Sequence, residues 1–182
     1  VVVAITNGGR GEQTGPSPTA TRATPSRLSP AGVTDFDPRA DGGNDEENPG
    51  QARLAIDGKK NTAWTTLRYL NNPKLGLLKP GVGLVVDLGK PVQVGSVKLW
   101  LQGKPTAVEL RMPAKTSKDQ APLRTIKEWR VTAKNPKAGQ NLSLSPDKPV
   151  TTRYVLVYLT SLPSTGGSNY RGAIAEIEVY SP

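Results

Sequence analysis

The sequence contains no cysteine and no histidine among its 182 residues. Without cysteine the chain can form no disulfide, hold no metal through a thiolate and use no cysteine nucleophile. Histidine is the commonest general base and the commonest transition-metal ligand, so its absence removes both of those roles. A hydrolase with a Ser-His-Asp triad and a zinc enzyme with histidine ligands are therefore excluded. The lack of cysteine also suits a bacterial envelope that does not rely on disulfides.

Long apolar runs are missing as well. Apolar residues make up 35% of the chain, and none of their runs approaches the roughly 20 residues that span a bilayer. The only methionine is Met112, and position 1 is valine, which we interpret as the sign of a piece cut from a longer protein. The apolar residues 1–5 fit either the stub of a membrane helix or a short first strand. We favour the stub, because a polar stretch rich in Gly and Pro follows directly.

Acidic residues are outnumbered by basic ones, which gives a net charge of +9. Such a charge raises the possibility of a nucleic-acid partner. However, the Lys and Arg residues are scattered, and the few aromatic residues do not alternate with them along one strand. We therefore expect a solvated basic surface and no nucleic-acid partner. The same charge is compatible with an anionic cell wall or with lipid phosphates.

The composition changes at about residue 31. Residues 1–31 are rich in Gly, Pro, Ser and Thr, and we expect a flexible linker there. Residues 32–182 contain short segments of alternating polar and apolar residues that are separated by Pro, Gly and Asn. The expected strands are 83–88, 95–101, 107–112, 125–131, 141–144, 153–159 and 174–180, with one helical turn at about 51–55. About seven or eight short strands predict an all-β domain, an antiparallel β-sandwich, over residues 32–182.

The segment from Asp57 to Trp64 begins with Asp-Gly, which marks a tight turn because glycine accepts backbone angles that other residues resist. The turn directs the Asp57 carboxylate, the Thr62 hydroxyl and several carbonyls toward one small volume. Oxygen ligands that converge in this way suit a hard cation such as calcium. An ordinary turn capped by Asp57, with Trp64 in the core, explains the same residues.

Six carboxylates crowd a second segment, namely Asp35, Asp37, Asp41, Asp45, Glu46 and Glu47. Carboxylates this close repel one another unless cations or basic side chains balance them. Their spacing does not match an EF-hand loop. A solvated loop is the preferred interpretation, and a second calcium site is the alternative.

The motifs of the folded part occur in a recognisable order. They are Ala55-Ile56-Asp57-Gly58 with Thr62-Ala63-Trp64, Val86-Asp87-Leu88-Gly89, residues 94–101, Val108-Glu109, Trp129, residues 153–157 and residues 174–179. This ordered set resembles the discoidin or coagulation factor 5/8 type C group and covers about Val33 to Tyr180. The resemblance implies a galactose-binding-like jelly roll.

A narrower set of motifs comprises Phe36-Asp37-Pro38 with the acidic loop after it, residues 65–69, and Leu78-Lys79-Pro80-Gly81-Val82-Gly83-Leu84. This set is similar to the C-terminal extracytoplasmic module of actinobacterial MviN proteins, which are relatives of the lipid II flippase. The resemblance implies a module on the extracytoplasmic face of the bacterial membrane, tethered through the preceding part of the full-length chain. Its expected partner is a cell-wall glycan, a lipid-linked peptidoglycan precursor or an envelope protein.

The resemblance also implies a metal site. In calcium-binding relatives of this fold, the ion lies between the Asp-Gly turn and the last strand. Carried over by position, the ligands of a structural Ca²⁺ are the side chains of Asp57, Thr62 and Glu176 and the backbone carbonyls of Lys60 and Ala175. Glu178 shares a face with Glu176 and is an alternative ligand. In the competing interpretation Lys59 or Lys60 neutralises Asp57 and no ion binds.

Ligands of this fold usually bind to loops at one end of the sandwich. The expected binding residues are Trp64, Arg68, Tyr69, Tyr170 and Arg171, because aromatic rings stack on sugars and Arg offers paired donors to hydroxyls or phosphate. Sugar-binding relatives often place a histidine in this site, and this chain has none, which leaves sugar binding open.

We expect no catalysis, because no two carboxylates stand out as a pair in one pocket. The expected function is a non-catalytic binding or sensor module of an MviN-like flippase. The alternative is a carbohydrate-binding module of a secreted hydrolase or the sensor domain of a receptor kinase.

Overall fold

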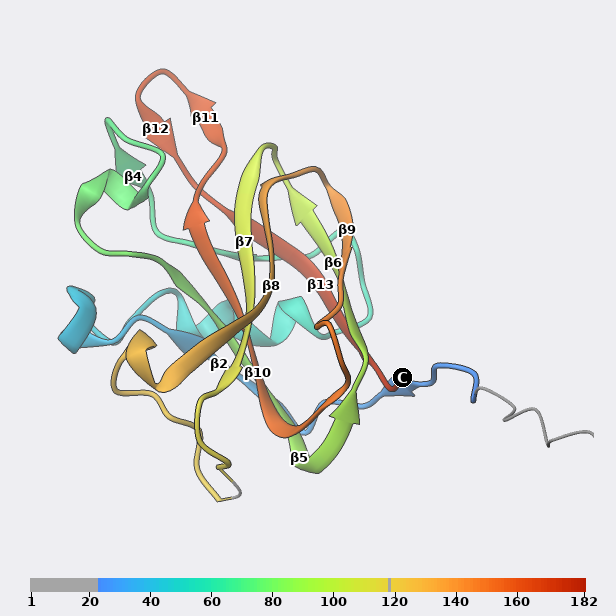
Figure 1. Ribbon diagram of the computed structural model, residues 1–182. Helices are drawn as coiled ribbons and strands as arrows, with labels where there is room; N and C mark the ends of the chain where they lie inside the picture. Colours follow the sequence, from blue (N-terminus) through green and yellow to red (C-terminus); the bar gives the residue numbers. More distant parts are fainter. Residues whose placement is uncertain (1–22, 118) are drawn as a thin grey trace, which may run out of the picture.

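Two antiparallel β-sheets lie face to face in the structure, a computed structural model that describes residues 23–117 and 119–182 (Figure 1). The apolar side chains that alternate along the strands meet between these sheets and form the main core. This arrangement confirms the all-β antiparallel sandwich. The apolar residues 1–5 and most of the expected linker lie outside the described residues.

The first sheet has the strand order β2 (Gly32–Phe36), β5 (Val82–Val94), β10 (Val150–Ser161), β7 (Thr106–Pro113) and β8 (Trp129–Ala138). Its middle strand β10 is buried on both faces. Val155 and Val157 point into the main core, whereas Leu156 and Tyr158 pack with Trp129 in a second apolar cluster on the other face. Because both faces of β10 are covered, its sequence is a nearly continuous apolar run and does not alternate with polar residues.

The second sheet has the order β1 (Arg27–Leu28), β13 (Ala173–Tyr180), β6 (Ser96–Gln102) and β9 (Asn141–Leu144), and β3 (Trp64–Thr65) also pairs with β13. Alternate residues of β6, including Val97 and Leu99, are buried in the main core. Their neighbours Lys98 and Trp100 lie on the outer face, as the two-residue period of a strand requires.

Most of the expected strands are present, but some of their limits differ. The strand expected at 83–88 continues to Val94, because Gly89 adopts a left-handed φ of 78° and pairing with β10 resumes after a register shift. The segment 125–131 is not one strand, since the short helix η4 (Ile126–Glu128) precedes β8. The expected helical turn is present as η2 (Pro49–Ala55), and η1 (Arg39–Asp41) lies before it.

The folded part begins before the expected boundary at residue 32. Strand β1 pairs with the end of β13, so that Arg27 lies opposite Tyr180 and Leu28 opposite Val179. The Ser26 backbone N–H also donates to Ser181 Oγ at 2.9 Å. Residues 26–28 are therefore part of the sandwich and not of a linker. Within the described ranges, no helix is long and apolar enough to cross a membrane.

A third, small sheet joins β11 (Ser164–Gly166), β12 (Asn169–Tyr170) and β4 (Tyr69–Leu70). It contacts η3 (Leu75–Leu77) through β4. Figure 1 shows this sheet at the end of the sandwich that is remote from the C-terminus. We call this end, with the connecting segments around β4 and β12, the loop end.

Candidate functional site

The ladder between β4 and β12 determines which side chains of the loop end face outward. Tyr69 pairs with Tyr170, and Leu70 pairs with Asn169. Tyr69 is buried and Tyr170 is half-buried, and both pack against the main core. Since side chains alternate along a strand, the residues on either side of this tyrosine pair face solvent.

Arg68 and Arg171 are the two exposed residues that continue this ladder. Arg68 directly precedes Tyr69 and Arg171 directly follows Tyr170, so the two arginines flank the last residue pair of the ladder on the same side. Two positive charges on neighbouring backbone segments repel each other, so the pair favours a bound anion. Within residues 23–117 and 119–182, neither guanidinium has a hydrogen-bond or ion-pair partner, so the donors of both are available to a ligand.

Two of the three aromatic residues expected to stack on a ligand are buried, and the third is half-buried. Trp64 is 0% exposed and donates its Nε1–H to the Glu47 carbonyl at 2.7 Å. The Tyr69 ring is buried, and Tyr170 faces the core. The expectation of a stacking role was therefore wrong for Trp64 and Tyr69, because both side chains are buried in the main core. Of the five expected binding residues, the structure presents Arg68 and Arg171 to solvent.

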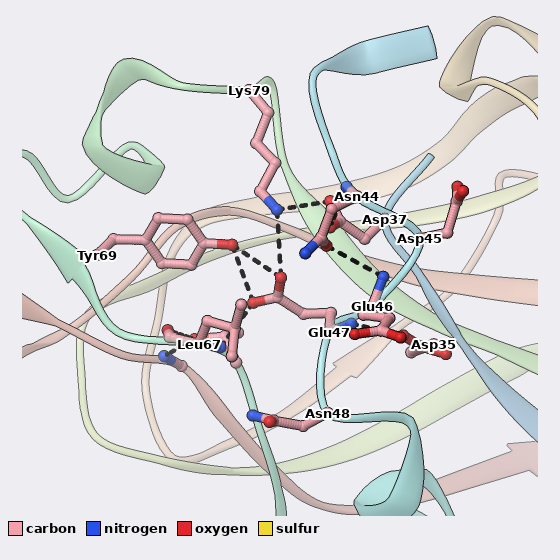
Figure 2. A network of polar contacts seen from close by, with 12 residues as sticks. Asp35, Asp37, Asn44, Asp45, Glu46, Glu47, Asn48, Leu67, Tyr69 and Lys79 are labelled. Carbon is pink, nitrogen blue, oxygen red and sulfur yellow. Dashed lines mark hydrogen bonds and ion pairs between the residues drawn. The ribbon is translucent and has the colours of Figure 1, made fainter. Parts of the chain in front are cut away.

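A buried carboxylate fixes the segment that carries Arg68 (Figure 2). Glu47 is 0% exposed and accepts a hydrogen bond from the Leu67 backbone N–H at 2.7 Å. It also accepts the Tyr69 hydroxyl proton, with oxygen–oxygen distances of 2.9 and 2.8 Å to its two carboxylate oxygens. Because Leu67 and Tyr69 flank Arg68 in the chain, Glu47 holds the backbone on both sides of that residue.

Lys79 supplies the positive charge of this network. Its Nζ lies 2.6 Å from Asp37 Oδ1 and 3.2 Å from Glu47 Oε2, and the side chains of both carboxylates are at most 1% exposed. Burial raises the pKa of Glu47 above its ordinary value, and the Lys79 charge and the hydrogen bonds offset this only in part. Burial and the neighbouring Glu47 charge likewise raise the pKa of Tyr69.

Three of the four remaining acidic residues of this segment also bond to the protein. Asp35 accepts from the Glu47 backbone N–H, Asp41 accepts from Thr125 Oγ1 and the Ile126 backbone N–H, and Asp45 pairs with Arg39. The expectation of a solvated loop was wrong for Asp35, Asp37, Asp41 and Glu47, whose carboxylates hold the loop to the sandwich, whereas Asp45 and Glu46 are exposed. Among the described residues, no group of three or more acidic side chains is arranged to hold a metal ion.

A cavity of about 700 Å³ lies beside this network at the loop end. Lys74, Lys79 and Asp41 contribute its charged side chains, and Leu77 and Leu78, each 71% exposed, contribute apolar surface. Its single carboxylate, Asp41, already accepts two hydrogen bonds. This cavity therefore lacks the pair of carboxylates that glycoside hydrolysis requires.

Two of the segments implied for calcium, the Asp-Gly turn and the last strand, are in contact. The last strand reaches the Asp-Gly turn, because the Gly58 backbone N–H donates to Glu176 Oε2 at 3.0 Å. Within the turn, Thr62 Oγ1 donates to Asp57 Oδ2 at 2.8 Å. Lys60 does not approach Asp57 as a counter-ion in the described contacts, and its Nζ lies 3.9 Å from the centre of the Trp100 ring.

The two carboxylates of this region differ in their electrostatics. Burial raises the pKa of Glu176, against the effect of the Gly58 hydrogen bond and the Arg27 charge. For Asp57 desolvation acts in the same direction, but the hydrogen bonds from Thr62 and Lys59 prevail and lower its pKa. Asp57 is thus an ionised turn cap, whereas Glu176 is a buried group that depends on its partners.

No known family model matches the sequence. Solved structures, however, share the fold. CpGH89CBM32-6 from Clostridium perfringens is 15% identical with a TM-score of 0.57, over 86% of this chain and 100% of that one. The CBM32 of AlyQ in complex with 4,5-unsaturated mannuronic acid is 16% identical with a TM-score of 0.57, over 85% of this chain and 97% of that one. The family 32 carbohydrate-binding module of Clostridium perfringens NanJ in complex with galactose is 19% identical with a TM-score of 0.55, over 87% of this chain and 100% of that one. The chain is similar to these carbohydrate-binding modules in fold, and its β-sandwich is galactose-binding-like.

Proposed function

We propose that the chain is a non-catalytic module that binds an anionic glycan at its loop end. The observation that carries this proposal is that Arg68 and Arg171 are exposed beside the β4–β12 ladder and that their guanidinium groups have no partner among the described residues. The fold neighbours support a glycan as the ligand class, since two of them contain galactose or an unsaturated mannuronic acid.

The charge of the site favours an acidic sugar over a neutral one. A guanidinium pair offers parallel N–H donors that match a carboxylate or phosphate group. The tyrosine rings of the ladder face inward, so neutral sugars lack the stacking surface that usually binds them. The net charge of +9 attracts anionic polymers over a longer range.

We place this function at the extracytoplasmic face of the bacterial membrane, where the ligand is a cell-wall glycan or a lipid-linked precursor. The resemblance of the Leu78–Leu84 motif to MviN modules supports this setting. A module attached to a secreted hydrolase would use the same surface, and the fold neighbours support that setting equally well. A protein ligand in the envelope is the competing outcome of the test below.

Replacing Arg68 or Arg171 by Gln is expected to weaken binding of an acidic oligosaccharide about tenfold or more, since a charge-assisted hydrogen bond contributes about 1.5–3 kcal/mol. Isothermal titration with oligomannuronate and with a neutral galacto-oligosaccharide measures the effect. The double variant is expected to lose the preference for the acidic ligand. Arg130→Gln, an exposed arginine on β8, is the control and keeps wild-type affinity.

The variants are compared with the wild-type chain by thermal unfolding, because a solvent-exposed side chain is not expected to alter stability. Wild-type affinity of the Arg68 and Arg171 variants would show that the loop end is not the binding site. Binding of an envelope protein, in the absence of binding by either sugar, would overturn the glycan proposal.

A further inference from the structure

The Asp57–Trp64 turn and the last strand, β13, are held together by hydrogen bonds and ion pairs to carboxylates. Both oxygens of Glu176 are engaged, Oε2 by the Gly58 backbone N–H at 3.0 Å and Oε1 by Arg27 Nη2 at 2.8 Å. Both oxygens of Asp57 are engaged as well, Oδ1 by the Lys59 backbone N–H at 2.9 Å and Oδ2 by Thr62 Oγ1 at 2.8 Å.

This donor set does not fit a calcium ion. Calcium requires about six to eight oxygen ligands that direct lone pairs at one point. Here Thr62 donates its hydroxyl proton to Asp57, and Glu176 accepts from a guanidinium and a backbone amide. Lys60, whose carbonyl was an implied ligand, adds a further positive charge to the same turn. The side chains that the resemblance assigns to the ion therefore satisfy one another.

Arg27 provides the cation of this region. Its guanidinium bridges two carboxylates, with Nη2 at 2.8 Å from Glu176 Oε1 and Nη1 at 3.1 Å from Glu178 Oε1. The Glu176 side chain is 1% exposed, so it needs a positive partner, whereas the Arg27 side chain is 45% exposed. The pairing of β1 with β13 brings Arg27 to this place.

We propose that the Arg27 guanidinium takes the place of the calcium ion, so that the domain folds without metal and strand β1 closes the sandwich. The contacts of Glu176 then join three segments: β1 through Arg27, the Asp-Gly turn through Gly58, and β13 through Glu176 itself. The residues of these contacts differ from those of the proposed glycan site, because they belong to β1, the Asp-Gly turn and β13 and not to the segments beside the β4–β12 ladder.

Calorimetry of the unmodified chain tests the metal part of this inference. We expect the same Tm within about 1 °C after EDTA treatment and in millimolar CaCl₂, and no heat of binding when CaCl₂ is titrated into metal-free protein. A rise of about 5 °C or more with calcium would overturn the inference, as would a saturable heat with one ion per chain.

Variants at position 27 test the part played by the guanidinium. Arg27→Met is expected to lower Tm by about 5 °C or more, because it leaves Glu176 buried without its cation. Lysine keeps the positive charge but cannot bridge two carboxylates with a planar fork. The Tm of Arg27→Lys is therefore expected to lie between those of the wild-type chain and Arg27→Met. The matched control is Arg39→Met, which removes an ion pair to Asp45 whose side chains are 76% and 57% exposed and is expected to shift Tm by no more than about 2 °C. Equal shifts for Arg27→Met and Arg39→Met would contradict the proposal.

Discussion

Replacing Lys79 by methionine is expected to lower the free energy of unfolding by about 3–5 kcal/mol, the largest loss of any single substitution considered for this chain. The substitution retains the length of the side chain but leaves Asp37 and Glu47 buried without a cation. Chemical denaturation with urea at pH 7 measures the loss. A change below about 1 kcal/mol would show that the two carboxylates do not depend on Lys79.

Glu47→Gln is the matched variant on the other side of the ion pair. Glutamine still offers an oxygen to the Leu67 backbone N–H or the Tyr69 hydroxyl, and Asp37 still neutralises Lys79. We therefore expect a loss of less than about 2 kcal/mol. A greater loss for Glu47→Gln than for Lys79→Met would mean that the hydrogen bonds, and not the charge balance, hold the network together.

The pH dependence of the Lys79→Met variant gives a second readout. The folded-state pKa of Glu47 is raised above its ordinary value of 4.5, so the folded chain holds this proton more tightly than the unfolded chain. The stabilising effect of protonation is complete below about pH 4.5 and is lost as the pH rises through the folded-state pKa. Removal of the Lys79 charge raises that pKa further. The deficit of the variant relative to wild type should therefore be largest at pH 7 and shrink toward pH 4.5.

Gly83→Ala is expected to lower the free energy of unfolding by about 3 kcal/mol or more, the second largest effect. Gly83 lies in β5 opposite Tyr158 of β10, in the middle of the first sheet. A Cβ at this position would overlap the Val157 carbonyl oxygen and lie 3.0 Å from the Tyr158 Cα. The added methyl group therefore meets backbone atoms that cannot move without opening the ladder. Urea denaturation followed by tryptophan fluorescence measures the effect.

Gly32→Ala is the control for this prediction. Gly32 lies in β2, which pairs with the same strand β5, but a Cβ there meets nothing within 4 Å. We expect its stability to stay within about 0.5 kcal/mol of wild type or to rise slightly, since alanine restricts the unfolded chain. If the two variants lose stability equally, the loss reflects a general cost of alanine in this sheet and not the contact with Val157.

The motif from Leu78 to Leu84 combines an electrostatic role with a packing role. Lys79 balances two buried carboxylates, and Gly83 allows β5 and β10 to approach. Gly81 has a similar role, because a Cβ there would lie 2.5 Å from ring atoms of Tyr158. The motif that led to the MviN resemblance thus has a structural basis in the loop end and its supporting sheet.

The fold could be predicted from the sequence because period-two alternation is a local signal. Strands such as β6, with Val97 and Leu99 inside and Lys98 outside, are evident from neighbouring residues alone. The approach of Glu176 to the Asp-Gly turn was also predicted, and the Gly58 hydrogen bond confirms it. That prediction came from the resemblance, because no local pattern connects residues more than 100 positions apart.

The balance of charges could not be predicted in the same way. The Lys79 network joins segments around residues 37, 47, 67 and 79, and sequence distance says nothing about which base balances which acid. Strand β1 was missed because two residues in a polar, Pro-rich stretch carry no periodic signal. The aromatic residues were misplaced for a related reason: tryptophan and tyrosine suit a binding surface and a core equally well, and only burial decides between them.

The pairing of β1 with the far end of β13 has a mechanical consequence. Strand β13 starts beside β3, close to the Arg171 side of the loop end, and ends at its contact with β1. A pull between a ligand held at the loop end and the chain that precedes β1 is therefore transmitted along the length of β13. Two residue pairs and the Arg27 ion pairs join β1 to β13, and Ser26 and Ser181 are hydrogen-bonded beside them, so a short joint carries this load.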